Sequence, residues 1–300
     1  MSATASSTAS ANSALKIVPR YSQDRGNADH GWLKTFHTFS FAMYQDGKYD
    51  RFGSLRVINE DRVTPGEGFG THSHREFEIF SYIVNGELTH RDSLSNVEIL
   101  KRGDIQMTST GTGIRHSEYN DNKSQDVHFL QIWSLPYQRG LKPSYYTRHF
   151  TDAEKENKLV QVVGPIGADN VLDEREAKGP APVHSHIAMF STLLDPGKKV
   201  IHHVTAPYHK FTPDLPLTPS TDASTDGSKK VYIHVIQTTK YNPRFSLTNV
   251  DAPRVKVNGD LVLGEGDGAF VTGAKPDDDE GLTLENVGGG RAEVVLFEMD

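Results

Sequence analysis

Two histidines stand one residue apart in the stretch GFGTHSHREFE, residues 68–78, and a second pair of metal-type residues follows in GTGIRHSEYN. The first pair is His72 and His74, and the second is His116 and Glu118. Side chains at positions i and i+2 of a β-strand project from the same face, so each pair can bind one metal ion as a bidentate ligand. We therefore expect two such strands to converge on one ion inside a β-barrel.

The donor set indicates which ion this would be. Three imidazoles and one carboxylate suit Fe, Mn, Ni, Co or Cu better than Ca or Mg. An octahedral ion with four protein donors keeps two positions open for substrate, water or oxygen. The sequence thus predicts one divalent transition metal per chain, in a centre capable of catalysis.

The elements that must position these donors are short strands. Apolar runs of strand length recur, separated by Gly, Pro, Asn and Asp, and the Asn85-Gly86 step is expected to form a β-hairpin. Helical periodicity is scarce, and only residues 152–159 are expected to form one helical turn or two. Many short strands with turn signals predict an all-β sandwich or barrel.

The chain also contains an internal repeat. EILKRGDIQM (98–107) resembles LVLGEGDGAF (261–270), and TPGEGFGTH resembles DPGKKVIHH. The two pairs have different offsets, which locates an insertion in the second copy. Residues 211–230 are rich in Pro, Ser and Thr and fit that insertion as a mobile loop. We expect two copies of one β-domain, joined near residues 136–160.

Several other residues compete for the ligand role. Glu78 has the strand parity of His74 and is a rival ligand; otherwise it is expected to accept a hydrogen bond from a ligand histidine. His184 and His186 form another H-x-H pair, but it is out of register with the first copy, and we expect no ion there.

The remaining histidines are expected to be structural. Within the repeat, His203 matches His72, but Thr205 matches His74, and no H-x-E sequence follows. The second copy is therefore expected to be metal-free. His90 and His128 lie on expected strands, where structural roles are favoured.

Composition excludes several classes of function. The 300 residues carry a net charge of −7 without a cluster of Lys and Arg, which argues against direct nucleic-acid binding. No cysteine is present, so disulfides, zinc-thiolate sites, iron–sulfur clusters and thiol catalysis are excluded. Residues 1–14 are expected to be a disordered tail, and no apolar run approaches the roughly 20 residues of a membrane span. A cytoplasmic or nuclear location is expected.

Three stretches carry a resemblance to a known family. HGWLKTFHTFSFAMY (30–44), GFGTHSHREFEIFSYIVNGELTHRDS (68–93) and GDIQMTSTGTGIRHSEYN (103–120) resemble the pirin family of the cupin superfamily. The resemblance implies two stacked cupin barrels, each a double-stranded β-helix. It implies one metal, taken as Fe²⁺, in the N-terminal barrel, with ligands at His72, His74, His116 and Glu118 and with Glu78 outside the ligand set.

The expected domains are a metal-binding N-terminal domain at 15–145 and a metal-free C-terminal domain at 146–300 that carries the inserted loop at 211–230. Glu76 stands where the family commonly has a small residue, and on an ideal strand it would share the parity of Glu78, so a second carboxylate near the metal is left open.

The resemblance implies two activities that the ligand motif does not separate. One is a quercetin-type flavonol 2,3-dioxygenase, with a flavonol-like aromatic substrate, O₂, and Glu118 as the base that accepts the substrate's hydroxyl proton. The other is a redox-sensitive transcription co-regulator that binds a protein partner such as a transcription factor without turnover. A weaker third is a different cupin chemistry on a small metabolite. We favour the enzyme, because open metal positions beside a carboxylate are reactive.

Overall fold

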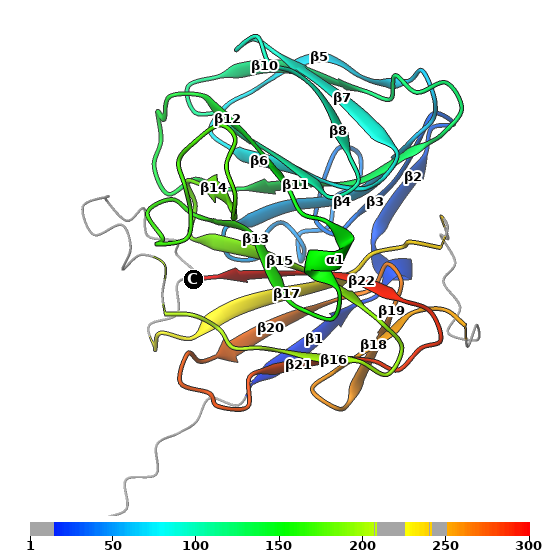
Figure 1. Cartoon of the computed structure of the whole chain (residues 1–300), viewed down its shortest axis with the longest axis vertical. Coiled ribbons are helices and arrows are strands. Elements are labelled where there is room, and N and C mark those ends of the chain that lie inside the picture. The colour runs from blue at the N-terminus through cyan, green and yellow to red at the C-terminus, as the bar shows by residue number, and fades with distance from the viewer. Residues whose placement is uncertain (1–14, 207, 209–225, 240, 242–250) are drawn as a thin grey trace, which may run out of the picture.

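The computed structural model describes residues 15–206, 208, 226–239, 241 and 251–300. The expected tail at 1–14 and most of the expected loop at 211–230 lie outside these residues. Figure 1 shows two β-barrels stacked along the long axis of the molecule, with β5, β7, β8 and β10 at one end and β16, β18, β19 and β21 at the other. The expected all-β class with two stacked barrels is confirmed.

The first barrel consists of a seven-stranded sheet and a four-stranded sheet. In spatial order the large sheet contains β12 (Ser144–His149), β9 (Asp104–Ser109), β6 (Glu78–Asn85), β11 (Val127–Ser134), β4 (Leu55–Val63), β3 (Leu33–His37) and β2 (Gly26–Asp29). The small sheet contains β5 (Gly68–His74), β10 (Ile114–Tyr119), β7 (Glu87–Asp92) and β8 (Val97–Lys101).

The second barrel repeats this plan. Its large sheet contains β1 (Lys16–Arg20), β20 (Gly268–Ala274), β17 (Lys229–Val235), β22 (Ala292–Met299), β15 (Ile187–Leu194), β13 (Val160–Pro165) and β14 (Ala181–Val183). Its small sheet contains β16 (Lys199–His202), β21 (Leu282–Asn286), β18 (Arg254–Val257) and β19 (Leu261–Gly264). In the first large sheet β11 lies between the earlier strands β6 and β4, and in the second β22 lies between the earlier strands β17 and β15.

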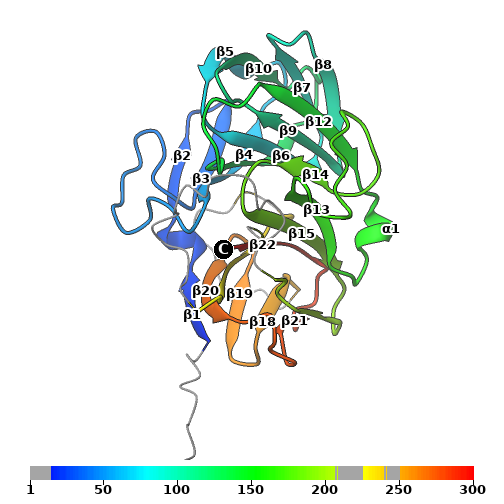
Figure 2. The same ribbon diagram turned by 90° about the vertical axis from the view of Figure 1, so that its left-hand side faces the viewer.

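Two strands cross the expected division at residues 145 and 146. β1 pairs antiparallel with β20, with Lys16 opposite Thr272, so the N-terminal strand belongs to the second barrel's sheet, as Figure 2 also shows. β12 pairs with β9 of the first barrel and ends at His149. The two halves of the chain are therefore interlocked by an exchanged strand.

The expected hairpin at Asn85-Gly86 is wrong. β6 ends at Asn85 and pairs with β9 and β11, whereas β7 begins at Glu87 and pairs with β8 and β10. Gly86 has a φ of 80°, and a Cβ there would lie 2.5 Å from the carbonyl oxygen of Asp126. A glycine with positive φ often forms a tight hairpin. In this structure it instead turns the chain from the large sheet to the small sheet.

Within the described ranges, helix is confined to short segments. The expected turn within 152–159 is confirmed as α1 (Asp152–Lys155), which Thr151 and Glu154 close with a capping box. A 3₁₀ turn covers Ser22–Asp24. Among the described residues no helix has the length and apolar character needed to cross a membrane.

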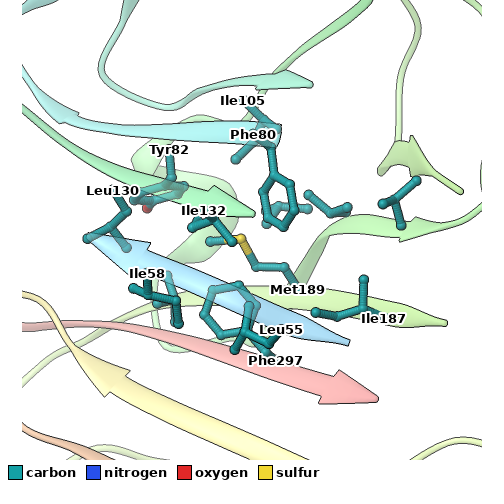
Figure 3. Packing of buried hydrophobic residues seen from close by; sticks show 14 of the residues in the cluster. Leu55, Ile58, Phe80, Tyr82, Ile105, Leu130, Ile132, Ile187, Met189 and Phe297 are labelled. Atoms are coloured by element: carbon teal, nitrogen blue, oxygen red, sulfur yellow. The ribbon is translucent and has the colours of Figure 1, made fainter. Parts of the chain in front are cut away.

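The main hydrophobic core lies between the barrels, where the two large sheets face each other. Phe80 and Tyr82 of β6 pack in one cluster with Met189 of β15 and Phe297 of β22, as Figure 3 shows. Side chains of alternate parity on β6 point the other way, so Ile83 joins a second cluster within the first barrel. The interior of the second barrel forms a third cluster.

We expect Phe80→Ala to lower the free energy of unfolding by about 3–5 kcal/mol, because it opens a cavity in a core that the rigid sheets cannot close. Phe80 is fully buried, whereas Met43 is 96% exposed. The control Met43→Ala should change stability by no more than about 0.5 kcal/mol. Urea unfolding followed by circular dichroism measures both, and equal effects would contradict this assignment of the core.

Candidate metal centre

The register of two small-sheet strands positions the predicted donors. β5 and β10 pair antiparallel with His72 directly opposite His116 and His74 opposite Ile114. A register shift between His116 and Glu118 locally distorts β10. Both pairs of the sequence motif therefore lie on adjacent strands, as their spacing predicts.

The three imidazoles come together. Ring centroids lie 4.6 Å apart for His72 and His74, 4.6 Å for His72 and His116, and 4.9 Å for His74 and His116. One ring nitrogen of each residue lies within 4.8 Å of the others. His116 is buried, and His72 and His74 are half-buried, so the cluster opens to one side.

Glu118 belongs to a neighbouring group. Its carboxylate lies within 4.8 Å of ring nitrogens of His116 and His90, and all three residues are buried. Gln131 Nε2 donates to Glu118 Oε2 at 2.8 Å, and Ser81 Oγ donates to Oε1 at 3.4 Å. His116 is thus shared by the imidazole cluster and the carboxylate group, and Glu118 lies on the buried side of the cluster.

His90 was expected to be structural, yet it lies in this group. β10 pairs with β7 so that Glu118 is opposite His90 and His116 is opposite Asp92. Residues opposite each other on one face are close neighbours. His90 Nε2 lies 3.2 Å from Asp92 Oδ2. The position of His90 beside Glu118 follows from the pairing of β7 with β10, which no local sequence pattern encodes.

Burial keeps two of the imidazoles neutral. Burial, followed by the charges of His116 and His72, lowers the pKa of His74 to about 4. Burial, followed by His90 and His72, lowers the pKa of His116 to about 3. A neutral imidazole offers a lone pair, so neither ring must lose a proton before it can bind a metal at neutral pH.

The nitrogen geometry fits a metal ion. His72 Nδ1 lies 2.7 Å from the carbonyl oxygen of Gly70, where it can only donate, and this leaves His72 Nε2 as an acceptor in the neutral ring. That Nε2 lies 3.1 Å from His116 Nε2. Two nitrogens bound at right angles to one ion, each at about 2.1 Å, would be roughly 3.0 Å apart. The three imidazoles thus form a group able to hold a transition metal.

Glu78 does not face this cluster, which corrects its assignment as a rival ligand or a partner of a ligand histidine. Ser109 Oγ donates to its Oε1 at 2.6 Å, and the backbone N–H of His184 donates to its Oε2 at 3.0 Å. The chain turns between β5 and β6, where Glu76 has a φ of 60°, so strand parity does not carry from His74 to Glu78.

Glu76 also lies away from the imidazoles. Its carboxylate accepts the backbone N–H of Gly140 at 3.2 Å, and Glu76 is half-buried. The second carboxylate that an ideal strand would place near a metal is therefore not there.

The His184 side chain lies at the contact between the barrels, beside Glu78. Its Nδ1 lies 3.4 Å from Glu78 Oε2. Burial opposes protonation of His184, but the hydrogen bond and charge of Glu78 outweigh it and raise the pKa of His184. Neither metal-type group found in the described ranges includes His184 or His186.

In the second barrel, Lys229 lies beside the histidine–carboxylate pair. His202 Nε2 lies 2.9 Å from Glu298 Oε2, and Lys229 Nζ lies 3.3 Å from Glu298 Oε1. Thr205, the residue that replaces a ligand histidine, donates its hydroxyl to Glu298 at 2.7 Å. A lysine ammonium thus supplies a fixed positive charge beside this donor pair.

Aromatic side chains border His74. Trp133 packs edge-on against the His74 ring with centroids 4.8 Å apart, and Phe77 and Phe41 lie 5.1 and 5.4 Å from Trp133. A cavity of about 440 Å³ also borders His74 and is lined in addition by Arg75 and Arg115. Aromatic rings therefore border the imidazole cluster beside His74, and a cavity with cationic side chains also reaches His74.

Two stacked barrels of this topology, with a cluster of imidazoles in the first, define a two-domain cupin protein. The family model described as Pirin matches residues 19–134. The quercetin 2,3-dioxygenase of Escherichia coli K12 is 40% identical over 190 residues, which cover 63% of this chain and 77% of that protein. The pirin-like protein of Caulobacter vibrioides is 40% identical over 144 residues, 48% of this chain and 62% of that one.

Solved structures agree with these relatives. The bacterial pirin YhhW of Escherichia coli, in complex with nickel(II), is 30% identical and has a TM-score of 0.71, covering 95% of this chain and 99% of that chain. The chain belongs to the pirin family. A divalent metal is accordingly consistent with both the family and the donor group.

We expect the metal-free protein to lose stability as the pH falls from 6.5 towards 4. Unfolded histidines bind protons near the ordinary pKa of 6.5, whereas folded His74 and His116 bind them only near pH 4 and 3. The unfolded state therefore takes up more protons in this window and is favoured. Urea unfolding of EDTA-treated protein at pH 7.5, 5.5 and 4.5 measures the slope.

The matched variant is His116→Gln, which removes one of these buried groups. Its free energy of unfolding should depend less steeply on pH than that of the native chain. Identical slopes in the two proteins would show that His116 does not have a depressed pKa.

Proposed function

We propose that this chain is a metal-dependent dioxygenase of the flavonol 2,3-dioxygenase type, with one divalent ion held by His72, His74, His116 and Glu118. The observation that carries the metal assignment is the 3.1 Å approach of His72 Nε2 and His116 Nε2, with the His72 tautomer set by Gly70. We take Fe²⁺ as the native ion because the resemblance to the family implies it, and a site of imidazoles and one carboxylate suits Fe²⁺ among other first-row transition metals. The relative named quercetin 2,3-dioxygenase supports the substrate class.

A bound transition metal would supply Lewis acidity toward a phenolic oxygen and an electron-transfer partner for O₂. The chain's own task is to orient an aromatic substrate and to remove a proton from it. The rings of Trp133, Phe77 and Phe41 offer apolar contacts beside His74, where a flat aromatic ligand can stack. A cavity of about 440 Å³ borders His74.

Glu118 is the base in this proposal. A flavonol binds as an anion after its 3-hydroxyl loses a proton, and the ligand histidines cannot accept that proton with nitrogens engaged on a metal. Gln131 holds Glu118 Oε2 at 2.8 Å, whereas Ser81 approaches Oε1 only at 3.4 Å. Oε1 is therefore the oxygen with spare capacity to accept a proton.

Lys229 supports a metal-free second barrel. An ammonium 3.3 Å from the Glu298 carboxylate would repel a divalent cation at that carboxylate. The proposal therefore assigns the single ion to the first barrel.

We expect one transition metal per native chain, and its loss from His72→Ala. The control His184→Ala removes a histidine of the other H-x-H pair, whose side chain contacts Glu78, and should retain the metal. Elemental analysis of proteins purified without oxygen measures both. Two ions per native chain, or equal loss from both variants, would contradict the assignment.

We expect Glu118→Gln to retain much of the metal and to lose turnover by roughly 10²-fold or more, the usual scale for losing a general base. The amide keeps an oxygen donor but has no basicity. The control Glu78→Gln alters another fully buried carboxylate of the same barrel, which contacts Ser109 and His184 instead. It should lower stability and leave turnover nearly unchanged.

Oxygen uptake with quercetin, together with metal content, measures both variants. A Glu118→Gln protein that keeps its metal and cleaves the flavonol at the native rate would rule out the base role. An iron-loaded native protein that consumes no oxygen with any flavonol would favour the alternative, a metal-containing transcription co-regulator that acts on a protein partner.

A further inference from the structure

A second cavity, of about 840 Å³, lies between the two barrels and does not border the imidazole cluster. Strands and loops of both halves line it, including Lys34, Arg62 and Arg102 from the first and Arg291 and Glu293 from the second. A volume in this range fits a small organic ligand, and cavities between domains are common ligand sites.

The charge of the cavity wall is opposite to that of the chain. Among the described residues, four cationic side chains line it, against two carboxylates, Glu293 and Asp126. The difference is 4 − 2 = +2, whereas the whole chain carries −7. A cationic surface within an acidic protein attracts anions to that place rather than to the surface in general.

Two of the four cations are already neutralised by neighbours. Arg102 reaches Asp152 and Glu293, each at 3.0 Å. Arg291 reaches Asp195 at 2.5 Å and Glu156 at 3.8 Å. These pairs shape the wall and leave little charge for a ligand.

Arg62 is incompletely compensated. Its nearest carboxylate, that of Glu60, lies 4.0 Å away and is also 3.3 Å from Arg25. Glu60 further takes hydrogen bonds from His128 at 3.0 Å and His234 at 3.1 Å, so one buried carboxylate serves two guanidinium groups and two imidazoles.

The protonation states of His128 and His234 do not change this incomplete compensation of Arg62. Burial comes first in lowering the pKa of both His128 and His234, so they add no charge at neutral pH. Burial also lowers the pKa of Arg62, and Glu60 and Glu265 do not fully offset it. Arg62 Nη2 donates to the carbonyl oxygen of Gln237, while its buried Nη1 has no hydrogen-bond partner in the part of the chain that the structure describes.

Lys34 completes the cationic side of the cavity. The described residues place no carboxylate in salt-bridge contact with it. The ring of Tyr241 lies between the two cations, with Lys34 Nζ 5.6 Å and Arg62 Cζ 6.0 Å from its centroid. Cations and an aromatic face thus meet on one wall, which matches a ligand with an anionic head and an organic body.

We propose that this cavity between the barrels binds a small organic dianion of the phosphate-monoester type, with its oxyanion at Arg62 and Lys34 and its organic part against Tyr241. A doubly charged oxyanion can accept from the Arg62 guanidinium and the Lys34 ammonium together. The site is separate from the metal centre and does not depend on the dioxygenase proposal.

Isothermal titration calorimetry of the metal-loaded full chain with phenyl phosphate tests this. We expect saturable 1:1 binding that weakens at least about tenfold in Arg62→Gln and in Lys34→Gln, the scale of losing one charge-assisted hydrogen bond. The control is Arg56→Gln, which removes the same charge from the same strand, where Arg56 donates to the carbonyl oxygen of Ser40 and does not line the cavity. It should bind within about twofold of native.

Two further arms distinguish other sources of binding. Phenyl phosphate should bind equally well to His74→Ala, because its site is not the metal centre, and it should bind more tightly than benzoate, which carries a single charge. Lys34→Gln remains decisive if Arg62→Gln fails to fold by circular dichroism. Absent binding, equal affinity in native and Lys34→Gln proteins, loss of binding in His74→Ala, or tighter benzoate binding would each overturn the proposal.

Discussion

The antiparallel register of β5 and β10 is the constraint on which the candidate centre depends. It sets His72 opposite His116, and a slip by one residue would turn one pair of donors to the outer face of the sheet. This register is held by the four-stranded sheet, which in turn closes against the large sheet that supplies Gln131 and Ser81 to Glu118. The imidazole cluster is therefore a property of a closed barrel, and the spacing of the motif alone does not create it.

Polar groups divide between the two faces of the first large sheet. On one face, Ser81 and Gln131 point into the barrel and hold Glu118. On the other, Glu60 is buried against the second barrel and binds Arg25, His128 and His234. Burial opposes the ionisation of Glu60, but the hydrogen bonds of His128 and His234 outweigh it and hold the pKa of that carboxyl well below its usual range. Alternation along neighbouring strands thus lets one sheet serve a candidate catalytic centre and an ionic contact between domains.

The sequence predicted what local spacing determines and missed what pairing between distant strands determines. Alternation along a strand was enough to group His72, His74 and His116, and frequent turn signals were enough to give the all-β class. The predicted hairpin at Gly86 was wrong because a glycine with positive φ is equally suited to a hairpin and to a turn that leads from one sheet to the other. Glu78 was misplaced because the turn at Glu76 breaks strand parity, and His90 was overlooked because its neighbour Glu118 lies on a strand far along the chain.

The positions of β1 and β22 bear on the order in which the chain can fold during synthesis. The strands of the first barrel lie between Gly26 and His149, so that barrel can close while the ribosome is still adding later residues. The second cannot, because β22 lies in the middle of its large sheet, between β17 and β15. Until β22 is made, the sheet that covers the apolar face of the first barrel, which includes Phe80 and Tyr82, lacks its central strand. β1 likewise has no partner until β20 has been made. The partly synthesised chain is therefore a folded first barrel with an exposed apolar face and an unpaired strand β1. Molecular chaperones act on intermediates of this kind.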